Sequence, residues 1–405
     1  MNKQEQREQN RERKIYLRHR IIWFLASNAI KPFLKLSVNL RRTKTPKLEK
    51  PYIVLSNHVT NLDPAILAAS FKKQMYFIAS EQFYRSGFKS KLLYWAFQPI
   101  SKIKGASDKL TVMKAIRTLK EGKNVALFPE GNRTFNGESA KSFVATGKLI
   151  KISGAGLVTY KIEGGYMTFP RWGFGKRKGR MKAGVVKVYS PEELKLMTAE
   201  EIVEHINEDI YTNAYEEQKK FPVMYKGKNL AFGMESAFSV CPECKKIGFI
   251  SSQGDSVFCT NCGTKAKLDQ YGFFNPEFKF KTVLEWDKWQ EDFYKDFVKK
   301  FKDPLTPLFQ DKNVAIRTVN SNHHTVELGY GTFSLYLDRF IFEPLDKPEI
   351  VFEIKNVPDT SVYGKSLFCF SDVEGKHYEL HPDKIINVRK YLSCWNILHK
   401  QYEKK

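Results

Sequence analysis

Hydrophobic residues between positions 46 and 222 fall into short runs that alternate with longer amphipathic stretches. The short runs are typical of buried strands and lie at residues 52–55, 75–79, 124–128, 157–160 and 185–188. The intervening stretches with helical spacing lie at residues 64–71, 110–121 and 142–152. Gly122 directly follows the second of these and is well placed to end it. Strands separated by helices of this length predict a layered α/β domain.

The pattern changes after residue 236. Two cysteine pairs come first, and aromatic and charged residues at helical spacing follow at 285–303. Short β-rich runs then alternate with turn residues from 312 to 383, before a helical run at 385–401. We therefore predict five regions: a basic amphipathic helical hairpin (1–45), the α/β domain (46–222), a small cysteine-rich ribbon (236–270), a helical linker (271–310) and a β-rich domain (311–405).

Apolar residues dominate one side of the segment from 15 to 40, and basic residues flank it. Pro32 is expected to end one helix and open the next, which gives the hairpin. Such a hairpin either packs on the following domain or lies in a membrane interface, with Trp23 and the cations at headgroup level. The longest apolar run, residues 21–30, is about half of the roughly twenty residues that a spanning helix needs. We expect no spanning segment and no secretory signal.

The net charge of +23 over 405 residues requires an acidic partner or ligand. Residues 1–50 hold fourteen Lys and Arg against four Glu, a net of +10. A second basic cluster has no acid within it and consists of Arg171, Lys176, Arg177, Lys178, Arg180 and Lys182. Anionic lipid headgroups, an acidic carrier protein and nucleic acid all remain possible partners for these segments.

His58 and Asp63 lie in a turn that follows the first predicted strand. Histidine is a suitable base for removing a hydroxyl proton at neutral pH, and a carboxylate on its other ring nitrogen fixes the tautomer. The five-residue spacing brings the two together only if His58 lies in the turn and Asp63 starts the next helix. Asp63-Pro64 fits an N-cap and first helical residue. A plain turn histidine and capping aspartate would give the same pattern.

A second run, Phe-Pro-Glu130-Gly131-Asn-Arg133-Thr, follows the third predicted strand. Ligands of α/β sheets bind where strands end. Arg133 can bind a phosphate through two hydrogen bonds, and Gly131 lets the backbone approach closely. Alone, this run would fit an ordinary turn with a surface arginine.

The two runs together resemble the glycerolipid acyltransferase family, which carries NHxxxxD and, further along, EGTRS. The first motif is intact here, whereas the second has Asn132 and Thr134 in place of Thr and Ser. Lys102 and Lys104 lie where the family places a basic block, although its usual arginine is missing. The Val-Pro of a further family block is also absent at residues 157–160. The resemblance covers residues 50–220.

The resemblance implies an O-acyltransferase that makes phosphatidic acid from lysophosphatidic acid, with acyl-CoA or acyl carrier protein as donor. It implies that His58 is the base, that Asp63 orients it, and that Arg133, Lys102 and Lys104 hold the acceptor phosphate. Glu130 and Gly131 would shape that turn. No catalytic cofactor is implied. Another lysolipid or a glycerol phosphate is an alternative acceptor. A non-catalytic lipid-binding or nucleic-acid-binding protein is the alternative of a different class, although no nucleic-acid-binding signature is present.

The cysteines form two close pairs, Cys241 with Cys244 and Cys259 with Cys262, separated by fourteen residues. Each pair can form a knuckle that offers two thiolates, so the spacing predicts a structural zinc ribbon; iron in a rubredoxin-like site is the alternative. Cys369 and Cys394 stand alone, so in an intracellular protein the cysteine pattern indicates metal binding and free thiols and not disulfides. We expect a cytoplasmic protein, peripheral on the inner face of the membrane. The strand series and final helix of 311–405 resemble pleckstrin-homology and GRAM-type domains, which often bind lipid headgroups or proteins.

Overall fold

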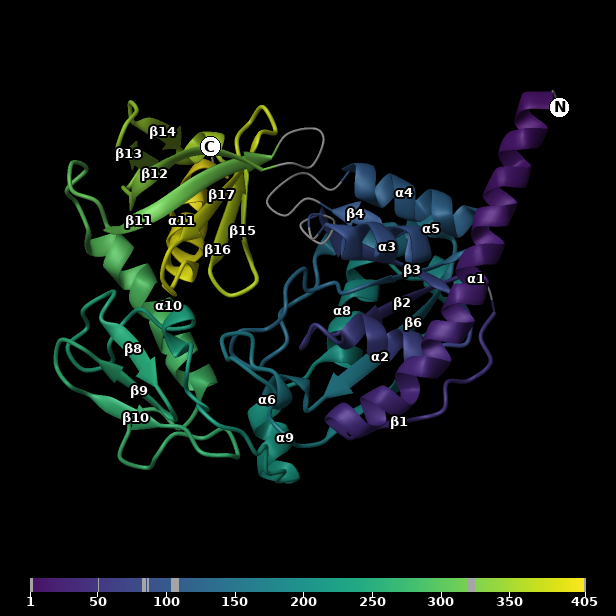
Figure 1. The fold of residues 1–405 in the computed structure, drawn as a ribbon, viewed down its shortest axis with the longest axis horizontal. Helices are drawn as coiled ribbons and strands as arrows, with labels where there is room; N and C mark the ends of the chain where they lie inside the picture. Colours follow the sequence, from purple (N-terminus) through teal and green to yellow (C-terminus); the bar gives the residue numbers. More distant parts are fainter. Residues whose placement is uncertain are drawn as a thin grey trace.

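The computed structural model describes residues 3–49, 51–81, 85, 87–102, 109–319 and 325–403. An N-terminal part built on a mostly parallel sheet lies beside a C-terminal part built on an antiparallel sheet (Figure 1). A segment with three short strands and one long helix connects the two parts.

The N-terminal segment is a single helix, α1 (Lys3–Val38), so the predicted hairpin is wrong. Its buried positions include Trp23, Leu34 and Val38, and they keep one face across Pro32. Pro32 lies on the exposed side, where the carbonyl that it leaves unbonded can meet water. Trp23 fixes the packing by donating its Nε1–H to the carbonyl of Phe71 at 3.1 Å.

By length and composition, the stretch Asn10–Val38 of α1 is apolar enough to cross a membrane. The expectation that no segment spans a membrane stays a prediction, because this character is one of length and composition alone. The outward face carries large apolar side chains, among them Phe24, Leu25, Phe33 and Leu36.

Seven strands form the sheet of the N-terminal part, in the order β1-β7-β6-β2-β5-β3-β4. Every neighbouring pair is parallel except β6 with β7. The strands are β1 (Leu40–Arg42), β2 (Tyr52–Ser56), β3 (Met75–Ser80), β4 (Ile100–Lys102), β5 (Asn124–Leu127), β6 (Gly156–Glu163) and β7 (Met181–Tyr189). The helices are α2 (Asp63–Ser70), α3 (Phe88–Phe97), α4 (Lys109–Lys120), α5 (Val144–Ser153), α6 (Gly165–Thr168), α7 (Pro191–Leu196), α8 (Ala199–Ile210) and α9 (Ala214–Lys220).

This sheet is covered on both faces, which explains why its central strands are continuous apolar runs. Residues of α1 and α2 pack with one face, and residues of α4, α5 and α8 pack with the other. The predicted α/β layering is confirmed for this part of the chain. Because β2, β5, β3 and β4 run in the same direction, their carboxyl ends meet at one edge of the sheet.

The connecting segment contains a three-stranded antiparallel sheet of β8 (Ile250–Gln253), β9 (Ser256–Cys259) and β10 (Lys265–Lys267). Helix α10 (Val283–Lys300) follows, and the side chain of Thr282 caps it by accepting from the backbone N–H of Glu285. Short 3₁₀ turns lie at Met234–Ser236 and Ile354–Asn356.

The C-terminal part is β-rich, as predicted, with strand order β14-β13-β12-β11-β17-β16-β15 and helix α11 (Arg389–Glu403) packed against the sheet. Its strands are β11 (Phe309–Val319), β12 (Thr325–Leu335), β13 (Arg339–Pro344), β14 (Ile350–Glu353), β15 (Asp359–Tyr363), β16 (Leu367–Ser371) and β17 (His377–Pro382). Tyr391 of α11 is buried among the phenylalanines of this sheet and donates to Asp311 at 2.7 Å.

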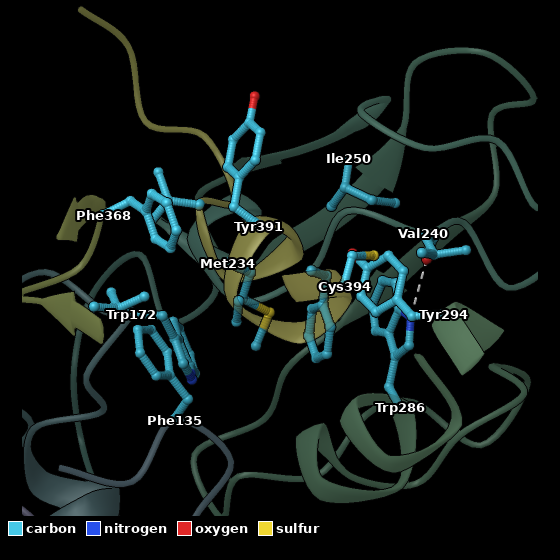
Figure 2. Packing of buried hydrophobic residues seen from close by; sticks show 14 of the residues in the cluster. Phe135, Trp172, Met234, Val240, Ile250, Trp286, Tyr294, Phe368, Tyr391 and Cys394 are labelled. Carbon is cyan, nitrogen blue, oxygen red and sulfur yellow. Dashed lines mark hydrogen bonds between the residues drawn. The ribbon is translucent and has the colours of Figure 1, made fainter. Parts of the chain in front are cut away.

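One hydrophobic cluster runs from the N-terminal part through the connecting segment into the C-terminal part. Figure 2 shows Phe135 and Trp172 on one side, Trp286 and Tyr294 of α10 on the other, and Met234 and Cys394 between them. The ring of Trp286 stacks on Phe238 with centroids 3.8 Å apart. The connecting segment is therefore packed into the molecule and holds the C-terminal sheet in place.

A buried carboxylate on α10 reinforces this packing. Asp287 accepts from Asn136 of the N-terminal part at 2.9 Å and pairs with Arg389 of α11 at 2.6 Å. The guanidinium of Arg389 also lies over the ring of Phe135, at 4.7 Å from its centroid. All three parts of the chain thus meet at one side chain.

Candidate functional site

His58 lies in the loop after β2, and Asp63 is the first residue of α2. The Nδ1 atom of His58 lies 2.7 Å from Oδ2 of Asp63. The N-cap position is Leu62, not Asp63 as predicted. The Asp63 carboxylate reaches back instead and accepts from the backbone N–H groups of Val59 and Thr60, at 2.7 and 2.9 Å.

Asp63 is fully buried, so its acceptor role sets the state of the histidine. Its other oxygen accepts from the Thr60 hydroxyl at 2.8 Å. A carboxylate that accepts this many hydrogen bonds favours a proton on the facing Nδ1 of His58. The lone pair then lies on Nε2, the nitrogen from which a neutral imidazole acts as a base.

Residues of the second motif form hydrogen bonds with both the backbone N–H and the backbone carbonyl of His58. Its N–H donates to Oε1 of Glu130 at 2.9 Å, and its carbonyl accepts from the N–H of Thr134 at 3.1 Å. The other oxygen of Glu130 accepts from the N–H of Ala140, also at 2.9 Å. The ring of Phe128 stacks on the imidazole with centroids 4.2 Å apart. Two motifs far apart in sequence are thus one structural unit.

Glu130 is almost fully buried, and burial raises its pKa from 4.5 to about 8. The two backbone N–H donors oppose this rise, and the negative charge of Asp63 adds to it. Glu130 therefore acts by holding the backbone of His58, and it does more than shape the turn. Gly131 provides that turn with φ of +71°, a conformation that side chains disfavour.

The guanidinium of Arg133 is half-buried near the dyad. Burial lowers the pKa of Arg133, and the charge of Asp63 opposes that effect. Within the described part of the chain, this guanidinium forms no hydrogen bond or ion pair. An unpaired, partly buried guanidinium beside a base fits an anionic group on a substrate.

Of the two lysines in the predicted basic block, the structure describes only Lys102. Lys102 ends β4 opposite Ser80 of β3, at the same sheet edge as His58. Two strand spacings of about 4.8 Å separate β4 from β5, which leads into the second motif. Lys104 lies outside the described residues.

The basic cluster at 171–182 does not form one exposed surface, contrary to expectation. Arg171 and Arg177 are buried, as is Trp172 between them. Arg171 donates to the backbone carbonyl of Arg133 at 2.7 Å. Arg177 donates to the carbonyl of Leu230 at 2.6 Å. These two arginines bind backbone carbonyls and are not part of an exposed basic surface.

Sequence reasoning missed several residues that build the site. Asn57 is buried and bonds both the N–H and the carbonyl of Ile162 at 2.8 Å, which ties the end of β2 to β6. Its place beside His58 was a usable signal. Phe128, which stacks on the imidazole, and Tyr363, whose hydroxyl is close enough to affect the pKa of Arg133, carried no local signal.

The four paired cysteines come together at the end of the small ribbon sheet. The sulfur of Cys241 lies 3.6 Å from that of Cys262, and the sulfur of Cys244 lies 3.8 Å from that of Cys259. All four sulfurs lie within 4.8 Å of one another. Tetrahedral zinc with bonds of about 2.3 Å holds its sulfurs about 3.8 Å apart, so the cluster is compatible with zinc.

A second group of ligand-type residues, Cys369, His377 and Glu379, is buried in the C-terminal sheet. Glu379 pairs with Arg85 of the N-terminal part at 2.7 Å and with His381 at 3.1 Å. Burial would raise the pKa of Glu379, but its hydrogen bonds with the histidines and the charge of Arg85 hold that pKa well below its usual range. A guanidinium thus already balances this carboxylate, and the group links the two parts of the chain.

Residues 37–178 match the family model described as acyltransferase. Among solved structures, the 1-acyl-sn-glycerophosphate (LPA) acyltransferase PlsC from Thermotoga maritima is similar at 19% identity. The similarity covers 49% of this chain and 79% of that chain, with a TM-score of 0.41.

Two other similar structures cover smaller shares of this chain. A chain of the 8S snRNP assembly intermediate is 17% identical over 25% of this chain and 87% of that chain, with a TM-score of 0.20. Inner membrane complex sub-compartment protein 3 (ISP3) from Toxoplasma gondii is 8% identical over 27% of this chain and 85% of that chain, with a TM-score of 0.19. All these scores are too low to establish a shared fold for the chain.

The raised pKa of Glu130 predicts a pH-dependent stability. A carboxyl group with a raised pKa in the folded protein stabilises it most below 4.5, and this contribution is lost as the pH rises through about 8. Glu130→Gln removes the titration. The free energy of unfolding of wild type, relative to this variant, should fall between pH 4.5 and 8 in urea denaturation. Glu138→Gln, a surface control paired with Lys288, should follow wild type. Parallel pH profiles for wild type and Glu130→Gln would contradict the assignment.

Proposed function

We propose that this protein transfers an acyl group from acyl-CoA or acyl carrier protein to the free hydroxyl of lysophosphatidic acid, giving phosphatidic acid. The observation that carries the proposal is the His58–Asp63 hydrogen bond of 2.7 Å in a stretch that matches the acyltransferase family model, with the unpaired guanidinium of Arg133 nearby. A base and an anion-binding group side by side suit a substrate that carries both a hydroxyl and a phosphate.

The reaction follows from the state of the dyad. Nε2 of His58 removes the proton of the acceptor hydroxyl as its oxygen attacks the thioester carbonyl. Asp63 stabilises the imidazolium that forms and keeps the ring oriented. The tetrahedral adduct then collapses, the carbon–sulfur bond breaks, and the imidazolium returns its proton to the leaving thiolate. The step needs no catalytic cofactor, because the proton taken from one substrate is given to the other.

The acceptor phosphate is assigned to Arg133, with Lys102 and Lys104 as further candidates. Arg133 is held through its backbone carbonyl by Arg171, and its turn is fixed to His58 through Thr134. A connected backbone therefore fixes the spacing between the two groups that would meet the hydroxyl and the phosphate. A different lysolipid or a glycerol phosphate shares this chemistry and remains the alternative acceptor. A non-catalytic nucleic-acid-binding role loses support, because Arg171 and Arg177 are buried.

His58→Ala should lower the rate of phosphatidate formation by at least about a hundredfold, because it removes the general base. Formation of product from lysophosphatidate and acyl-CoA is the measurement, with acyl carrier protein as a second donor and other lysolipids as parallel acceptors. His205→Ala, which changes an exposed histidine of α8, is the matched control and should leave the rate unchanged. Full activity in a folded His58→Ala protein would remove the mechanism.

We further propose that α1 lies in the interface of an anionic membrane on the cytoplasmic side. One face of the helix packs on the domain through Trp23 and Leu34, and the other exposes Phe24 and Leu36. A helix held to its domain in this way favours an interfacial position over a spanning one. The charge of the first fifty residues then adds attraction to acidic headgroups.

Binding to vesicles tests this placement. The protein should bind anionic vesicles more tightly than neutral ones, and salt should weaken the binding. Leu36→Glu places a charge on a residue that is 86% exposed on α1 and should reduce binding. Leu345→Glu is the matched control at 82% exposure in the C-terminal part and should not. Equal binding to both vesicle types would count against the proposal.

We propose that Cys241, Cys244, Cys259 and Cys262 bind one structural zinc ion. Four thiolates leave no open coordination position, so the ion would hold the ribbon and take no part in the reaction. Cys241 and Cys259 also belong to the large hydrophobic cluster. The ribbon therefore ties the metal to the packing of the C-terminal part.

Metal analysis of purified protein should give about one zinc per chain, with no iron. Cys241→Ser should lose the metal and lower the midpoint of thermal unfolding. Cys369→Ser, at a cysteine in the C-terminal sheet, is the control and should keep the zinc. A protein with all four cysteines reduced and no bound metal would overturn the proposal.

A further inference from the structure

The polar face of the C-terminal sheet lies against the turn that carries Arg133. In Figure 1, β15 and β16 are on the side of the sheet that faces the N-terminal part. The amide of Asn132 donates to the hydroxyl of Ser361 at 3.2 Å. Arg171 donates to the carbonyls of Val362 and Gly364, at 2.7 Å each, while it also holds the carbonyl of Arg133. Arg171 thus connects the β15–β16 turn to the turn that carries Arg133.

We call the contact between the β15–β16 turn and the turn that carries Arg133 the junction. Because side chains alternate along a strand, only every second side chain of β15 faces it. Val362 belongs to the hydrophobic core of the C-terminal part. Ser361 and Tyr363, its neighbours in sequence, therefore lie on the opposite face of the sheet. The contact of Ser361 with Asn132 shows that this face meets the second motif. Tyr363 lies on the same face, and its hydroxyl affects the pKa of Arg133.

Lys365, in the same turn, brings a further positive charge. Its ammonium donates to the carbonyl of Gly173 and lies over the ring of Phe174, 3.1 Å from the centroid. Burial, together with the nearby charge of Arg133, lowers the pKa of Lys365 to about 8.

The junction therefore gathers three cations, and the charge of Asp63, which is already bonded to His58, acts on Arg133. Within the residues that the structure describes, Arg133, Arg171 and Lys365 form no ion pair with a carboxylate. Like charges held together away from water are unfavourable unless an anion joins them. Lys365 is the one of the three that comes from outside the N-terminal part, so its position depends on the docking of the C-terminal sheet.

We propose that Lys365 and Tyr363 bind the phosphate of the acceptor together with Arg133, so that the C-terminal sheet completes the acceptor site. The identity of the acceptor rests on the function proposed above; the ligand chemistry is a phosphate monoester. The ammonium supplies charge, and the phenol supplies a hydrogen-bond donor from the opposite side of the junction to Arg133.

Binding to the full chain carrying His58→Ala, which prevents turnover, is the direct test. The probes are a short-chain lysophosphatidate and the matching monoacylglycerol without phosphate, measured by calorimetry. Adding Lys365→Met should raise the Kd for lysophosphatidate at least about tenfold and leave the Kd for the monoacylglycerol unchanged. Lys365→Arg should restore most of the affinity. Lys376→Met, at an exposed lysine in the β16–β17 turn, should change neither.

Tyr363→Phe provides a second variant that removes only a hydroxyl and should weaken lysophosphatidate binding selectively. Unchanged lysophosphatidate binding in Lys365→Met, or an equal loss for both probes, would overturn the proposal and leave Lys365 as a structural contact with Phe174. In the otherwise wild-type chain, Lys365→Met should raise the KM for the acceptor with little change in kcat.

The two proposals fail in different ways. Selective loss of phosphate-dependent binding in a protein with no acyl transfer would leave this inference standing and remove the proposed function. Acyl transfer by the wild type, with unchanged lysophosphatidate binding in Lys365→Met, would support the proposed function and remove this inference.

Discussion

The main chain of His58 is held at both its N–H and its carbonyl, by Glu130 and by Thr134. The rest of the site depends on this constraint. The loop after β2 has no regular structure of its own, and the imidazole can meet Asp63 only while that loop keeps its path. Because the same two residues flank Arg133, the bonds that hold the backbone of His58 also hold the turn that carries Arg133. The proposed base and the proposed phosphate ligand are therefore carried on one connected piece of backbone.

The elements with strong periodicity could be predicted from the sequence. The apolar run at 52–55 lies in β2, and the run at 124–128 covers β5. Both are buried on two faces, which is why local pattern was sufficient. Pro32 misled the prediction of a hairpin, since the proline rule describes local backbone chemistry. The buried stripe of α1 continues past Pro32, and packing of that stripe outweighs one missing hydrogen bond.

The candidate site could be predicted as a set of residues but not as a structure. The spacing of His58 and Asp63 required a turn followed by a helix, and the structure has both. The role of Glu130 depends on a bond between segments more than seventy residues apart, which no local pattern encodes. The same holds for Arg171, where a run of positive charge suggested an exposed surface. Its guanidinium is instead buried against three backbone carbonyls.

The hydrogen bonds of Arg171 to the β15–β16 turn all end on main-chain oxygen atoms. Backbone carbonyls are present whatever the side chains are, so these bonds do not depend on the amino-acid sequence of the turn. They stay available when the side chains at Tyr363 and Lys365 are exchanged. Under the proposed assignment, acceptor preference becomes a property that can be redesigned in a short peptide segment, separately from the chemistry proposed at His58.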